Sequence, residues 1–115
     1  MELFAPDAQK TSVDGATVDF YTWKEGDTTY YGFDTSRCGP PEPMVNAMAG
    51  LKLVTDPNVK LVMINHKMPM GLLNKIGENY EIAKKELPDG RVKLVFGYKP
   101  GASESANLDD SHCHG

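Results

Sequence analysis

The stretch "PPEPMVNAMAGLKLVTDPNVKLVMIN", residues 40–65, decides the fold because it has the pattern of a helix followed by a buried strand. Proline suits the first turn of a helix, and Glu42 puts negative charge near the positive end of the helix dipole. Residues 60–65 are apolar on both faces, as is typical of a central strand. We therefore predict a helix that begins near Pro41 or Pro43 and a strand after it. The apolar residues that repeat at helical spacing are Met44, Met48 and Leu51.

Two hairpins flank this unit. Aromatic and β-branched runs on either side of "EGD" predict a hairpin from about Val18 to Asp34. Near the other end, "YEIAKKEL" (80–87) and "RVKLVFGY" (91–98) predict two strands joined by the turn "PDG". A short helix is expected between them and the central strand, from about Pro69 to Ile76. Gly77 suits the left-handed position that follows a helix end.

The expected order is β-β-α-β-α-β-β, which makes an α+β fold: a two-layer sandwich with two helices on one face of a mixed sheet. The strands that end at Asp34 and Asn65 are joined by a helix, so they should run parallel. The loops that leave them then lie at one sheet edge, where ligands tend to bind. We expect a flexible arm over residues 1–16, one domain over 17–100 and a disordered tail over 101–115.

Composition narrows the classes of function. The 115 residues carry a net charge of −4 with no basic patch, which argues against nucleic acid as a partner. The longest aliphatic run, "LVMI", is too short to span a membrane, and the first residues lack the pattern of a secretory signal. Two cysteines do not form a disulfide framework, so we expect a cytoplasmic protein without membrane association.

Cys38 is the candidate catalytic residue. It stands just ahead of the predicted helix, whose dipole would favour the nucleophilic thiolate if the loop folds back over the helix start. The alternative is an inert small residue in a tight turn. No nucleophile–base–acid triad, glycine-rich phosphate loop or paired-carboxylate pattern accompanies it, so a non-enzymatic role is favoured.

The candidate ligand-binding residues are those that the topology brings to the shared edge: Pro40, Glu42, His66 and Met68. Two helix starts at one edge could also hold a small anion through backbone N–H groups. Glu42 is explained equally well by pairing with the helix dipole, and His66 by a packing or hydrogen-bonding role.

Two sets of side chains have the chemistry of soft-metal ligands. His66, Met68 and Met70 combine imidazole and thioethers, which suit Cu(I), although methionine is also a common core residue. His112, Cys113 and His114 in the tail could bind Zn or Cu, although three adjacent residues cannot close a four-ligand structural site alone. No cofactor is expected otherwise.

Between Asp34 and Lys99 the chain resembles the SirA-like family called domain of unknown function 2249, a relative of the TusA/SirA sulfur carriers. The motifs that carry the resemblance are "PPEPM" at 40–44, "HKMP" at 66–69 and "DGRV" at 89–92. The resemblance implies the two-layer fold. Sulfur carriers place their cysteine in a Cys-Pro-x-Pro motif, whereas here that position is Pro40 and Cys38 lies two residues upstream.

The sequence thus predicts a small binding or carrier module that presents a protein partner or a small anionic or thiol ligand at the edge of Glu42 and His66. One alternative is a persulfide relay through Cys38, and another is soft-metal binding. A homodimer through an exposed aromatic edge is also compatible with the pattern.

Overall fold

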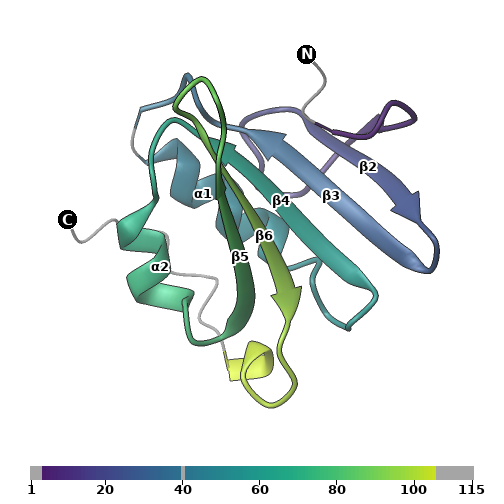
Figure 1. Cartoon of the computed structure of the whole chain (residues 1–115). Coiled ribbons are helices and arrows are strands. Elements are labelled where there is room, and N and C mark those ends of the chain that lie inside the picture. The colour runs from purple at the N-terminus through teal and green to yellow at the C-terminus, as the bar shows by residue number, and fades with distance from the viewer. Residues whose placement is uncertain (1–3, 40, 106–115) are drawn as a thin grey trace.

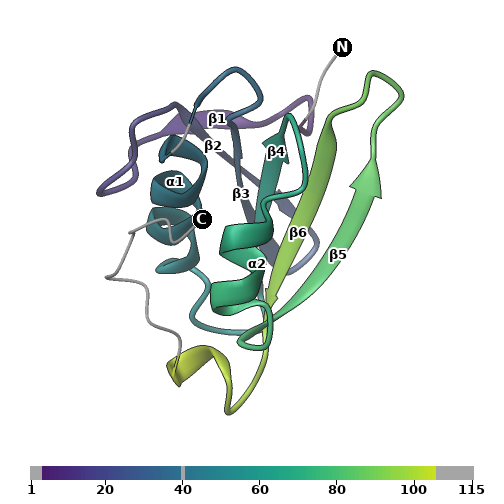
Figure 2. The same ribbon diagram turned by 90° about the vertical axis from the view of Figure 1, so that its left-hand side faces the viewer.

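The computed structural model describes residues 4–39 and 41–105, which form a six-stranded mixed sheet with two α-helices packed on one face (Figures 1 and 2). The strand order is β1-β2-β3-β4-β6-β5. The α+β fold class predicted from the sequence is confirmed. The strands are β1 Gln9–Thr11, β2 Phe20–Glu25, β3 Thr28–Asp34, β4 Val59–Asn65, β5 Tyr80–Glu86 and β6 Val92–Tyr98; the helices are α1 Glu42–Leu51, α2 Met70–Ile76 and the 3₁₀ helix η1 Ser103–Ser105.

The strand pairing follows the sequence pattern. The two predicted hairpins form as β2–β3 and β5–β6, both antiparallel. The central pair β3–β4 is parallel, as the intervening α1 requires, and its register pairs Phe33 with Met63. Because both strands of this pair end at the same sheet edge, the segments after Asp34 and Asn65 start side by side.

The main core lies between the helices and the sheet. Side chains from α1 and α2 pack on the inward-facing residues of β2, β3, β4 and β6, and Phe20 stacks on Phe33 with ring centroids 4.9 Å apart. Burial of this kind stabilises a fold by roughly 25 cal/mol per Å² of apolar surface. The residues with no more than 1% exposure in this core are Phe20, Phe33, Ala47, Leu51, Leu61, Met63, Leu72, Ile76, Leu94 and Phe96.

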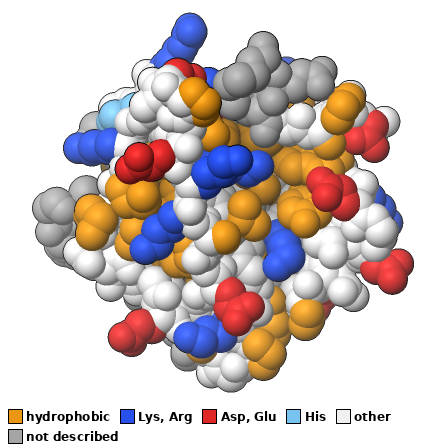
Figure 3. All heavy atoms as spheres, viewed as in Figure 1, with side chains coloured by type: hydrophobic (Ala, Val, Ile, Leu, Met, Phe, Trp, Pro, Cys, Tyr) orange, Lys and Arg blue, Asp and Glu red, His pale blue; other side chains and the backbone are white. Residues whose placement is uncertain are grey.

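None of the helices of the described residues covers the opposite face of the sheet, which is seen in Figure 3, where apolar side chains alternate with lysines and acidic residues. A smaller buried cluster of Trp23, Val62 and Ile64 lies here. Phe4 packs across it, because Gly32 has no side chain and leaves room for the Phe4 ring beside Trp23. Trp23, Tyr21 and Tyr30 of the first hairpin therefore cover this face of the sheet, whereas Phe20 and Phe33 belong to the main core.

Three local features differ from the sequence prediction. Residues 9–11, which we expected in a flexible arm, form β1 on the edge of β2, and residues 103–105 form η1; residues 106–115 lie outside the described residues. Gly77 has φ −61° rather than a left-handed conformation. Its lack of a side chain matters for a different reason, since a Cβ would come within 2.3 Å of the Leu73 carbonyl oxygen.

Within residues 4–39 and 41–105, neither α-helix is long and apolar enough to cross a membrane. The longer of them, α1, has ten residues, whereas a membrane-spanning helix needs about twenty.

Candidate functional site

Two loops leave the carboxyl ends of the parallel strands, and hydrogen bonds hold them together. The first loop spans residues 35–41, of which Pro40 lies outside the described residues, and the second spans residues 66–69. The Thr35 amide donates to the Ile64 carbonyl at 2.8 Å, and its hydroxyl donates to Asn65 Oδ1 at 3.1 Å. Asn65 Nδ2 in turn donates to the Lys67 carbonyl at 2.9 Å. The predicted meeting of the two loops at one edge is thereby confirmed.

Asn46 fixes the start of α1. Its side chain has no exposure, yet every polar atom has a partner: Oδ1 accepts from the amides of Thr17 and Val18, and Nδ2 donates to the Thr17 hydroxyl and the Glu42 carbonyl. A buried amide with fewer partners would destabilise the fold. Asn46 therefore ties the segment before β2 to the first turn of the helix.

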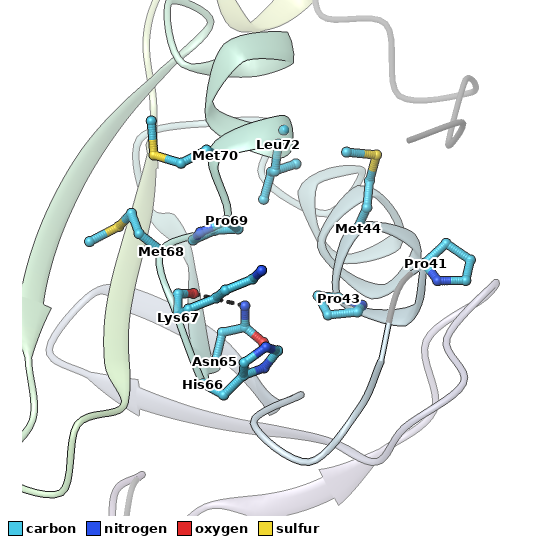
Figure 4. A pocket seen from close by; sticks show the side chains of 11 residues that line it. Pro41, Pro43, Met44, Asn65, His66, Lys67, Met68, Pro69, Met70 and Leu72 are labelled. Atoms are coloured by element: carbon cyan, nitrogen blue, oxygen red, sulfur yellow. Dashed lines mark hydrogen bonds between the residues drawn. The ribbon is translucent and has the colours of Figure 1, made fainter. Parts of the chain in front are cut away.

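A pocket of about 330 Å³ opens between the starts of α1 and α2 (Figure 4). Its walls are chiefly proline, methionine and leucine side chains, so the surface is apolar over most of its extent. The volume is at the lower end of the range for small-molecule sites. The lining residues are Pro41, Pro43, Met44, Asn65, His66, Lys67, Met68, Pro69, Met70, Gly71 and Leu72; we call this the helix-start pocket.

The polar groups of this pocket lie on one side. In Figure 4 the side chains of His66 and Lys67 extend toward the α1 side, whereas the thioethers of Met68 and Met70 lie on the opposite side. His66 and Lys67 are both exposed, and neither forms an ion pair with another described residue. An unpaired ammonium at the mouth of an apolar pocket is suited to an anionic group.

Cys38 of the first loop and Glu42 at the start of α1 form a separate group and do not line the helix-start pocket. Burial raises the pKa of the Cys38 thiol above its ordinary value; the hydrogen bond to Glu42 and the charges of Glu42 and Asp34 raise it further. Glu42 also accepts a hydrogen bond from the Thr17 hydroxyl. All these causes favour the neutral thiol at pH 7, which is the opposite of what a nucleophilic cysteine needs.

The structure brings the site residues predicted from the sequence to one edge but separates them into two groups. His66, Met68 and Met70 line the pocket, while Cys38 and Glu42 lie beside it. Pro40 is outside the described residues, so its assignment stays a prediction.

The metal-binding predictions also stay predictions. In Figure 4 the His66 ring and the thioethers of Met68 and Met70 point in different directions. Among the residues that the structure describes, no group of three or more His, Cys, Asp or Glu side chains could hold a metal ion. The tail ligands His112, Cys113 and His114 lie outside the described residues.

Sequence reasoning missed the polar residues that shape the site. Asn46 interrupts the apolar face of the predicted helix, and Asn65 ends a strand that is otherwise apolar on both faces. A polar residue at such a position signals a buried hydrogen-bond network. Lys67 gave no comparable signal, because an exposed lysine in a loop is common.

Comparisons with known proteins leave the family open. No protein-family model, curated protein or solved structure matches the chain. We therefore argue its function from the helix-start pocket itself.

Proposed function

We propose that this protein is a non-enzymatic binding module of the SirA-like kind, and that the helix-start pocket binds a ligand with an apolar body and an anionic end. The observation that supports this proposal is the pocket of about 330 Å³ between the two helix starts, with Lys67 on one side. A small amphipathic anion and an acidic side of a protein partner both have this chemistry.

The apolar body of the ligand would lie against the methionine and proline walls. Removing apolar surface from water contributes roughly 25 cal/mol per Å², so a short aliphatic chain gains a few kcal/mol on entering. Met68 and Met70 can adapt to ligands of different shape, because their unbranched side chains change rotamer easily. Met70 is 58% exposed, which leaves its thioether accessible from solvent.

The anionic end would face Lys67 and His66. Asp34 and Glu42, the carboxylates that act on the Cys38 thiol, do not line the pocket, although Glu42 stands between the lining residues Pro41 and Pro43. The binding residues in this proposal are thus Lys67 with His66 for charge and polarity, and Met68 with the helix-start prolines for apolar contact.

The persulfide relay through Cys38 receives less support. Its thiol has a raised pKa next to Glu42 and Asp34, and it lies outside the pocket lining. A sulfur carrier needs a thiolate that attacks a persulfide donor, and these surroundings disfavour that form.

Titration followed by backbone-amide NMR tests the proposal. We would add octanoate, 1-octanol and acetate separately, which compares the complete amphiphile with its apolar part and its anionic part. Octanoate is expected to bind with a Kd on the order of 1 mM or tighter, with weaker binding by octanol and none by acetate. Equal shifts from acetate and octanoate, or shifts spread over the whole sheet, would contradict the proposal.

A further inference from the structure

The strand β5 forms an unpaired edge of the sheet. All seven residues from Tyr80 to Glu86 pair with β6 without interruption, and among residues 4–39 and 41–105 no strand lies on the other side of β5. Figure 2 looks toward this edge and shows no part of the described chain in front of the middle of β5. A regular edge strand of this length offers a row of free backbone groups to another strand. The residues exposed on it are Glu81, Ala83, Lys84, Lys85 and Glu86.

The backbone groups that point outward can be assigned. The Leu87 amide donates to the Arg91 carbonyl, so Leu87 and Arg91 form a hydrogen-bonded pair next to the β5–β6 turn. Because hydrogen-bonded and non-hydrogen-bonded pairs alternate along an antiparallel ladder, Ala83 and Lys85 direct their backbone groups toward β6. The N–H and C=O groups of Ile82 and Lys84 therefore point away from the sheet.

We propose that two copies of this chain pair through β5 in an antiparallel register centred on Ala83, which joins their sheets across a twofold axis. In this register Ala83 faces its own copy, Ile82 faces Lys84 and Glu81 faces Lys85. Ala83 and the Glu81–Lys85 pairs occupy non-hydrogen-bonded positions, where side chains approach most closely. The small alanine at the axis allows that approach, and each glutamate meets a lysine.

The charges select this register. A twofold axis at Lys84 would place two lysines opposite each other, and an axis at Ile82 would leave Glu81 facing Ala83. Only the axis at Ala83 pairs Glu81 with Lys85 twice. Opposite charges at facing positions stabilise strand pairing by roughly 0.2–1 kcal/mol each, and like charges destabilise it.

Lys85 also has no counter-charge in the part of the monomer that the structure describes. It lies directly opposite Lys93 in the β5–β6 register, and no described carboxylate forms an ion pair with either side chain. Such a pair of facing lysines is unfavourable. Glu81 of the second copy would lie next to Lys85 and offset the repulsion. Lysines on an edge strand usually prevent pairing. Here Lys85 gains Glu81 across the axis, whereas Lys84 faces Ile82 and gains no counter-charge.

The pairing would involve only one strand from each copy, so the interface is smaller than a standard one of about 800 Å² per partner. A weak dimer is therefore expected. This interaction surface is independent of the helix-start pocket, because no residue of β5 lines that pocket.

Sedimentation velocity between about 10 μM and 1 mM tests the dimer in a concentration range that suits a small interface. Wild type is expected to dimerise, Glu81→Lys and Lys85→Glu each to weaken association by about tenfold, and the double variant to recover it. Lys84→Pro should abolish dimerisation without unfolding the monomer, because its N–H points to solvent; circular dichroism checks the fold.

Hydrogen exchange identifies the strand. Protection of the Ile82 and Lys84 amides should rise with protein concentration, whereas the Ala83 amide, which is directed toward β6, should be protected at every concentration. A protein that stays monomeric throughout, a double charge reversal that restores nothing, or a dimer that survives Lys84→Pro would overturn the proposal.

Discussion

The two loops at the carboxyl ends of β3 and β4 lie at the same sheet edge but have opposite chemistry. At the first loop, burial raises the pKa of the Cys38 thiol, and the carboxylates of Glu42 at the start of α1 and Asp34 at the end of β3 raise it further. The second loop presents Lys67 and His66 beside an apolar pocket. Parallel strands explain why the loops meet, but the side chains determine which of them can bind an anion.

This difference shows that a reactive-looking residue is not by itself the centre of a site. Cys38 attracts attention in the sequence, yet its burial and its acidic neighbours raise the pKa of the thiol, which disfavours the reactive thiolate. Lys67 is inconspicuous in the sequence, yet it lines the pocket, where its positive charge can attract an anionic ligand.

Asn46→Ala should have the largest effect, because it removes the amide that holds the first turn of α1 against the segment before β2. Four hydrogen bonds to Thr17, Val18 and Glu42 are lost in a fully buried place. We expect the free energy of unfolding to fall by about 3 kcal/mol in urea denaturation. Asn74→Ala, at an exposed position of α2, is the control and should change it by less than about 0.5 kcal/mol.

Asn65→Ala should lower the free energy of unfolding by a smaller amount, about 2 kcal/mol. The Thr35 hydroxyl keeps the Ile64 carbonyl as an acceptor, so only the Lys67 carbonyl loses its partner completely. The second loop should loosen as a result, and octanoate affinity should drop together with stability. If affinity stays at the wild-type level, the second loop does not shape the pocket.

Lys67→Gln should weaken octanoate binding by about fivefold, since an exposed ion pair contributes up to about 1 kcal/mol. Binding of 1-octanol should not change, because it has no charge. Lys24→Gln, on an exposed part of β2, serves as the matched control and should leave both affinities intact. NMR titration in low and moderate salt measures these effects, and a loss of octanol binding would count against the assigned role of Lys67.

Glu42→Gln should lower the pKa of Cys38 and speed its alkylation about two- to threefold near pH 8. Burial, the largest cause of the raised pKa, remains in the variant, so the change is small. The pH–rate profile with iodoacetamide measures it in a Cys113→Ser background, which removes the second thiol. Glu78→Gln, an exposed change elsewhere, is the control. If the midpoint of this pH–rate profile is the same with and without Glu42→Gln, Glu42 does not act on the Cys38 thiol.

The fold could be predicted because its signals are local and periodic. The helix that precedes "KLVMIN" and the alternation of Val92, Leu94 and Phe96 follow from the spacing of apolar residues. The parallel pairing of β3 and β4 then follows from the helix between them. The strand β1 was missed because its three residues show no apolar alternation, and only pairing with β2 makes them a strand.

The site could be predicted only in outline. Topology placed Cys38 and His66 at one edge, but spacing along the chain does not show that His66 lines the pocket while Cys38 lies beside it, near Glu42 and Asp34. That division depends on tertiary contacts. The pocket walls include Pro41 and Leu72, which a sequence pattern assigns simply to a helix start and a core.

The most direct measurement is an NMR experiment on the protein labelled with ¹³C at its methionine methyl groups, in the presence of octanoate. Met44, Met68 and Met70 line the helix-start pocket, whereas Met48 and Met63 are buried elsewhere and serve as internal controls. We predict nuclear Overhauser contacts between the octanoate chain and the three pocket methyl groups, with none to the two controls. Contacts to none of the three, while octanoate binds near Cys38 or elsewhere, would contradict the account.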